Sequence, residues 1–183
     1  MSAAAGGRWE PRTFVHHSSW VQEAGNGMNW IAASGIEGAA DLRVELAAEE
    51  DAVAPATYTV RLHFIEPGEA AEGQRQFSVR LQGSEVISDI DVARMAGGAK
   101  RALVQEVTGV QVTGEVLVSL APAPDAQYPP VLCGIELVRE DGGEAAVGQN
   151  EGDASYRWAA ASRGWTDRLA ALLHLRPMAI LSR

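Results

Sequence analysis

Residues 57–66 read Thr-Tyr-Thr-Val-Arg-Leu-His-Phe-Ile-Glu, and residues 75–82 read Arg-Gln-Phe-Ser-Val-Arg-Leu-Gln. In both runs apolar side chains alternate with polar ones, the spacing of a β-strand that buries one face and exposes the other. The two runs therefore predict strands of an antiparallel sheet in a sandwich. The segment between them, residues 67–73, is rich in Gly and Glu, and function in such folds usually lies in loops of this kind.

Short apolar runs of the same type continue on both sides of this stretch. They occupy residues 42–46, 86–92, 103–107, 116–120 and 131–138. Gly83-Ser84 indicates a tight hairpin, and the proline-rich residues 121–130 indicate a loop. This succession predicts an all-β fold, an antiparallel β-sandwich.

The length of 183 residues suits one domain with a sizeable core. We expect the sandwich to occupy residues 9–140. Residues 141–155 have the composition of a linker, and residues 156–183 predict a C-terminal helical tail. Its short helix begins at Thr166, a suitable N-cap, and ends before Pro177.

Composition excludes several classes of function. The formal net charge of −9 disfavours nucleic acid as a partner, because an acidic surface repels phosphates. We expect a soluble chain with no membrane segment and no export signal, because no apolar stretch approaches spanning length. The single cysteine, Cys133, lies in an apolar run and is predicted to be a core residue.

The order of motifs from Gly35 to Arg139 resembles the malectin family of carbohydrate-binding modules, in particular the type appended to bacterial multidomain proteins. The resemblance is carried by residues 30–38, 58–66, 75–83, 86–92 and 130–137. It implies a jelly-roll-like sandwich that binds glucose-type oligosaccharides through loops at one end, without catalysis. It also implies other domains of a parent protein as partners and an extracytoplasmic location.

The resemblance leaves a second function open. Where the family has aromatic residues that lie against sugar rings, this chain has Pro67, Gly68 and Glu69. The alternative is a structural or protein-protein interaction sandwich that has lost its sugar site.

Sugar binding needs an apolar platform and a few fixed polar groups, which directs attention to two loops and one tryptophan. Tyr128 is the candidate platform in the loop 121–130, and it could otherwise cover the sandwich edge. The remaining candidate ligand residues are Asp125, Gln127, Glu66, Glu69 and Trp30. The glutamates could otherwise be solvated surface charges, and Trp30 could close the core.

Two further patterns invite a chemical interpretation that the spacing does not favour. His16-His17 are adjacent and would face opposite ways on a strand, so they do not predict a shared metal ion. Asp89-x-Asp91 could hold Ca²⁺, but capping of backbone N–H groups is the favoured interpretation. We therefore predict no metal, no cofactor and no catalytic residue.

Overall fold

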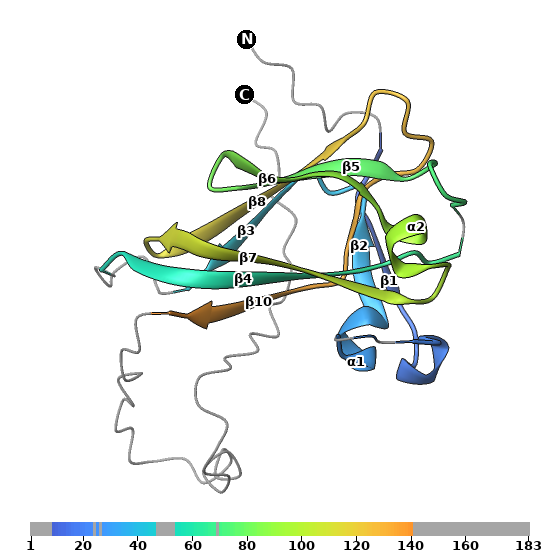
Figure 1. Ribbon diagram of the computed structural model, residues 1–183, viewed down its shortest axis with the longest axis horizontal. Coiled ribbons are helices and arrows are strands. Elements are labelled where there is room, and N and C mark those ends of the chain that lie inside the picture. Colours follow the sequence, from blue (N-terminus) through green and yellow to red (C-terminus); the bar gives the residue numbers. More distant parts are fainter. Residues whose placement is uncertain (1–8, 24, 26, 47–53, 69, 141–183) are drawn as a thin grey trace, which may run out of the picture.

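The computed structural model describes residues 9–23, 25, 27–46, 54–68 and 70–140. The predicted linker 141–155, the predicted tail 156–183 and Glu69 lie outside the described residues. The described part is built from antiparallel strands with three short helical elements, so the predicted all-β sandwich is confirmed (Figure 1).

One layer of the sandwich is a sheet in the order β10-β4-β7. Its central strand β4 (Ala56–Ile65) pairs with β10 (Gly134–Arg139) on one side and with β7 (Ala102–Val112) on the other. The β4–β7 ladder shifts register between Tyr58 and Val60, which marks a β-bulge.

The other layer has the order β3-β8-β5-β6. It contains β3 (Asp41–Glu45), β8 (Glu115–Pro122), β5 (Gln76–Leu81) and β6 (Ser84–Asp91). Gln82 (φ 51°) and Gly83 (φ 81°) form the two-residue turn between β5 and β6. Two successive positive φ values suit the right-handed twist of a tight hairpin. The predicted hairpin is confirmed, but its turn lies one residue earlier than Gly83-Ser84, because Ser84 already belongs to β6.

The two runs that decide the fold lie in opposite layers. β4 belongs to one sheet and β5 to the other, and residues 66–75 run from the first to the second at the edge of the molecule (Figure 1). The rings of Phe64 and Phe77 meet across the interior with centroids 5.7 Å apart. The apolar faces of β4 and β5 therefore pack against each other from opposite sheets and do not lie side by side in one sheet.

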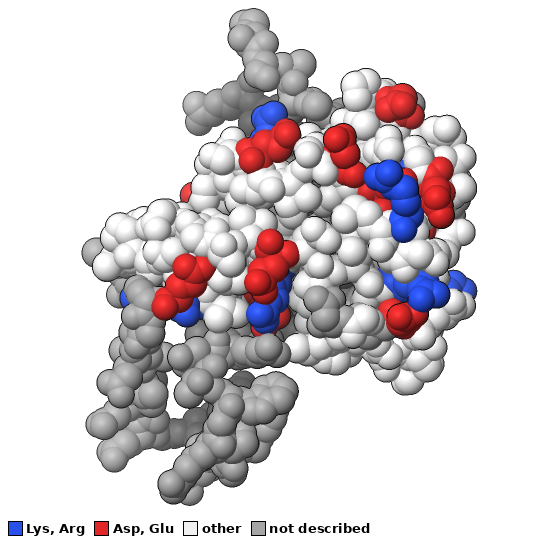
Figure 2. Space-filling model, in the orientation of Figure 1, with Lys and Arg blue, Asp and Glu red and all other residues white. Residues whose placement is uncertain are grey.

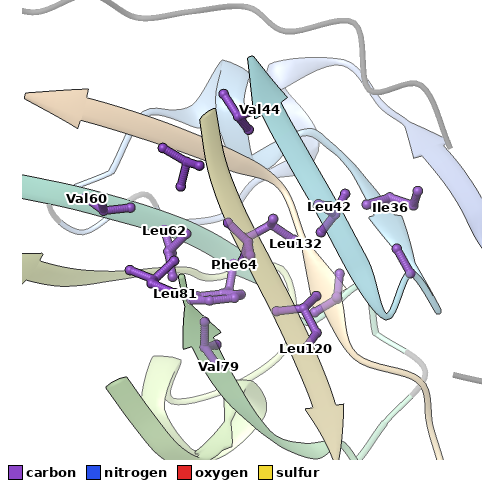
Figure 3. Close-up of a cluster of buried hydrophobic side chains, with 14 of the residues drawn as sticks. Ile36, Leu42, Val44, Val60, Leu62, Phe64, Val79, Leu81, Leu120 and Leu132 are labelled. Atoms are coloured by element: carbon purple, nitrogen blue, oxygen red, sulfur yellow. The ribbon is translucent and has the colours of Figure 1, made fainter. Parts of the chain in front are cut away.

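The core is made of the inward-facing apolar residues of both layers (Figure 3). Alternate residues of β4 and β5 point into it, and β3, β8 and the strands around residue 132 complete it. The labelled members are Ile36, Leu42, Val44, Val60, Leu62, Phe64, Val79, Leu81, Leu120 and Leu132. The burial of such side chains is the main source of stability for a fold of this kind.

A small third sheet, in the order β1-β2-β9, closes one side of the sandwich. It consists of β1 (Arg12–Val15), β2 (Ser34–Glu37) and β9 (Val131–Leu132). The predicted strand 131–138 is therefore divided at Cys133, with β9 in the small sheet and β10 beside β4. β1 and β2 lack a clear alternating pattern and were not predicted.

The helical elements are short and lie at the ends of the sandwich. They are the 3₁₀ helix η1 (Ser18–Trp20), α1 (Asn29–Ala32) and α2 (Val92–Ala96). Among the described residues there is no helix of the length and hydrophobicity needed to cross a membrane. On the face shown in Figure 2, acidic and basic side chains lie in small groups between uncharged surface, without a continuous basic patch.

Candidate functional site

A buried arginine connects the segment between the two layers to the small sheet. Arg75 is fully buried, with its Nε 2.8 Å from Glu66 Oε2 and its Nη1 2.7 Å from Glu37 Oε1. Arg12 binds the other oxygen of Glu37 at 2.8 Å. We call Arg75, Glu66 and Glu37 the buried arginine cluster. Its charges are paired with each other, which a charged group in a protein interior requires.

The same arginine positions the loop 121–130. Arg75 Nη1 donates a hydrogen bond to the carbonyl oxygen of Pro129, and its guanidinium carbon lies 5.6 Å from the ring centroid of Tyr128. The backbone N–H groups of Gln127 and Tyr128 both donate to the carbonyl of Gln74, at 2.8 and 3.1 Å. The loop is thus fixed to the start of β5 by direct contacts.

Three of the predicted site residues lie together in this braced loop. Tyr128 is half-buried, whereas Asp125 and Gln127 are exposed. The Gln127 side-chain oxygen accepts a hydrogen bond from Gln74 Nε2 at 3.2 Å, which holds the amide at the surface. The loop therefore presents one aromatic ring and two polar side chains in a fixed arrangement.

Glu66 lies in the interior and not at the surface of its loop. Its Oε1 accepts from the backbone N–H groups of Gly68 and Ala70 at 3.0 and 3.1 Å, while Oε2 faces Arg75. The structure therefore gives Glu66 a supporting position beneath the loop. The interpretation of Glu66 as a solvated surface charge is wrong, because its exposed fraction is 0%.

Trp30 lies on α1 and does not close the core. The residue is 48% exposed, so the core interpretation is wrong. α1 lies below the labelled strands in the view of Figure 1, whereas the loop after β8, coloured gold, lies above them. The structure thus does not bring Trp30 into the group formed by Tyr128, Asp125 and Gln127.

The other aromatic residues near α1 are packed together. His16 stacks on Trp20 with centroids 4.1 Å apart, and Lys100 Nζ lies 5.6 Å from the centroid of the Trp20 ring. His17 Nδ1 lies 2.9 Å from Ser19 Oγ and accepts from the Ser19 backbone N–H, at the start of η1. Each of the two histidines thus has its own local partner.

Of the two residues Asp89 and Asp91, only Asp91 has the predicted capping role. Asp91 is buried and accepts from Arg94 N at 3.2 Å, as the N-cap of α2, and from Gly73 N at 2.6 Å. Asp89 is exposed and has a positive φ of 53°. Within the described residues there is no group of three or more His, Cys, Asp or Glu side chains arranged to hold a metal ion.

Cys133 is buried in a small apolar cluster beside Ile65 and Ala32, as the sequence predicts. Burial raises the pKa of its thiol, because the thiolate would lose its hydration.

The buried arginine cluster was not predicted. Glu66 directly follows β4 and Arg75 directly precedes β5, at the two ends of a charged loop. Charged residues at the ends of such a loop usually lie at the surface. Their burial is explained by the ion pairs of Arg75 with Glu66 and with Glu37, a residue far away in the sequence.

Comparison with solved structures shows which proteins share this fold. Several extracellular domains of plant receptors share it. The structure of plant peptide RALF23 in complex with FER and LLG2 aligns with a TM-score of 0.57 and 17% identity, over 78% of this chain and 41% of that chain. The ANXUR1 extracellular domain from Arabidopsis thaliana aligns with a TM-score of 0.55 and 16% identity, over 75% of this chain and 39% of that chain.

Comparison of the sequence finds one family model and one plant receptor-like protein. Residues 49–127 match the model of the malectin domain. A stretch of 62 residues is 42% identical to Receptor-like protein 4 of Arabidopsis thaliana, and it covers 33% of this chain and 10% of that protein. The chain thus spans a small part of this relative and less than half of the two structures. These three relatives are plant proteins, and the bacterial appended type stays a prediction.

Proposed function

We propose that this chain is a non-catalytic carbohydrate-binding module of a larger, extracytoplasmic protein, and that it holds a glucose-type oligosaccharide on the loop 121–130. The similarity to the malectin domain supports the class of module. The fold shared with plant extracellular domains supports the location.

The braced loop is the observation that carries the proposal. A sugar ring binds through its apolar C–H face to an aromatic ring and through its hydroxyls to fixed polar groups. Tyr128 supplies the ring, and Asp125 and Gln127 supply an acceptor and a donor beside it. Because Arg75 and Gln74 already fix the loop, little conformational entropy is lost on binding.

Calorimetric titration with glucose oligosaccharides of different linkage tests the proposal. Tyr128→Ala should weaken binding about tenfold or more, whereas Tyr128→Phe, which keeps the ring, should bind nearly as well as the wild type. Asp125→Asn should also weaken binding, and Asp89→Asn, at an exposed position on β6, serves as its matched control. Equal affinity of the wild type and Tyr128→Ala would place the sugar elsewhere.

Trp30→Ala distinguishes two arrangements of the ligand. If the sugar occupies the loop 121–130 alone, this variant should bind like the wild type, since α1 lies away from that loop (Figure 1). A loss of affinity for longer oligosaccharides only would indicate a second contact at α1.

The alternative function is protein interaction. It is supported by the segment 66–75, which has no aromatic residue, and by the exposed apolar side chains Val15 and Trp30. Among the structural relatives, one is a complex that contains a peptide. A protein partner whose binding persists in excess oligosaccharide, is lost in Trp30→Ser and is retained in Tyr128→Ala would favour this alternative.

A further inference from the structure

His63 of β4 is a buried histidine that faces the carboxylate of Glu136 at 3.8 Å, beyond hydrogen-bond distance. Its exposed fraction is 2%, and among the described residues neither ring nitrogen makes a hydrogen bond. In the sheet it lies opposite Gly134 of β10 and Val104 of β7. A buried polar group in this condition is costly, which makes it a candidate for a role other than stability.

A row of charged side chains leads from the surface of the sheet to this imidazole. Glu106 Oε2 lies 2.6 Å from Arg61 Nε, and Arg61 Nη1 lies 3.3 Å from Glu136 Oε1. Glu136 Oε2 in turn lies 3.8 Å from His63 Nε2. The exposed fraction of the side chains falls along the row from 47% at Glu106 to 3% at His63. Glu136 thus forms an ion pair with Arg61 and also faces His63.

The helix α1 covers this position. A Cβ placed on Gly134 would lie 2.5 Å from Ile31 Cγ2 and 3.9 Å from His63 Cβ, so Ile31 rests directly on the sheet next to the histidine. The residues of α1 are Asn29, Trp30, Ile31 and Ala32, none of them titratable. Within the part of the chain that the structure describes, the charged groups that act on His63 are Glu136 from β10 and Arg61 from β4, while α1 and the β7 partner Val104 contribute none.

We propose that His63 is a proton-binding site that controls the docking of α1 on the sheet, and with it the presentation of Trp30. The neutral imidazole can remain beneath the apolar cover. The imidazolium would place a positive charge under Ile31, where the facing carboxylate of Glu136 replaces only part of its lost hydration. Protonation therefore favours a state in which α1 has moved away and water reaches the ring.

The direction of the pH effect follows from burial. Burial lowers the pKa of His63 in the docked state, because the charged form loses its hydration, and Glu136 offsets this only in part. An undocked state has a pKa near the ordinary value of about 6.5. The docked state is thus fully favoured above that value and loses stability as the pH falls below it. The ratio of undocked to docked molecules should rise by up to about tenfold per pH unit, until the docked pKa is reached.

NMR of the chain without ligand tests this site directly. The His63 ring and the Ile31 methyl groups are followed from pH 7.5 to pH 5. We expect His63 to titrate with a midpoint below the ordinary histidine value of about 6.5, and the Ile31 methyls to shift with the same midpoint. Ile31 signals that stay constant while His63 titrates would overturn the proposal.

Two variants separate His63 from the other histidines. In His63→Gln the Ile31 signals should become independent of pH, whereas in His17→Gln the response should persist. A pH response that survives in His63→Gln would also overturn the proposal. Where His63→Gln does not fold, Glu136→Gln serves instead: loss of the facing carboxylate should move both midpoints to lower pH together, and unchanged midpoints would contradict the mechanism.

The docking of α1 does not depend on the proposed sugar binding. Only its consequence at Trp30 rests on that function, because Trp30 is a predicted ligand residue. Since the NMR titration uses no sugar, its failure is distinguishable from a failure to bind oligosaccharide.

Discussion

Arg75 Nε lies 2.8 Å from Glu66 Oε2, and neither side chain is exposed to solvent. Arg75→Met would leave Glu66 and Glu37 as buried carboxylates without their common partner. We expect a loss of about 3–5 kcal/mol in the free energy of unfolding, measured by urea denaturation. Arg80→Met is the matched control, since Arg80 is exposed and 4.0 Å from Glu85, and it should change stability by less than about 1 kcal/mol. Equal effects would contradict a special role for the buried pair.

The N-cap at Asp91 gives a second prediction. Asp91→Ala removes the acceptor for the backbone N–H groups of Arg94 and Gly73 and should destabilise the fold by about 1–2 kcal/mol. Asp89→Asn, two residues earlier at an exposed position, removes the charge but keeps a side chain that tolerates the positive φ of 53°, and should be close to neutral. Thermal unfolding of the two variants side by side distinguishes a cap from a general effect of charge.

Gly134 allows Ile31 to approach the sheet, so a methyl group there should push α1 away. Gly134→Ala should cost about 1–3 kcal/mol, because the new Cβ would stand 2.5 Å from Ile31 Cγ2. Ile31→Ala should restore part of this loss in the double variant, which a double-mutant cycle in urea measures. Strictly additive effects of the two changes would show that the methyl groups do not collide.

Cys133 should be inert in the folded protein. Because burial raises the pKa of its thiol, almost no thiolate is present at neutral pH and the sulfur is shielded from reagents. A thiol-specific dye should label it slowly in buffer and rapidly in denaturant. Rapid labelling in buffer would mean that the strand division at residue 133 opens readily.

The sequence predicts the strands best where one face is buried. Tyr58 to Phe64 and Phe77 to Leu81 alternate because the two layers each bury one side, and the structure confirms both strands. β1 and β2 were not predicted because they are short and belong to a small sheet with little alternation. Which sheet a strand joins depends on pairing between distant residues, so the separation of β4 from β5 is not visible in their pattern.

The candidate site, too, could be predicted from the sequence only in part. The prolines and polar residues around Tyr128 predict an exposed loop, which the structure confirms for Asp125 and Gln127. Glu66 and Arg75 look like surface residues because a local sequence does not reveal an ion pair with Glu37, many residues away. The burial of Glu66 and the exposure of Trp30 both follow from tertiary contacts.

The crossing of residues 66–75 from one layer to the other decides where this chain tolerates a break. A cut or an inserted peptide at Gly83 falls at the tip of a hairpin whose two strands remain hydrogen-bonded neighbours. A break in residues 66–75 would instead remove the covalent tie between the two sheets at this edge and detach the buried arginine from one of its carboxylates. New termini, labels or grafted peptides therefore belong on the β5–β6 hairpin and not in the loop that adjoins the candidate site.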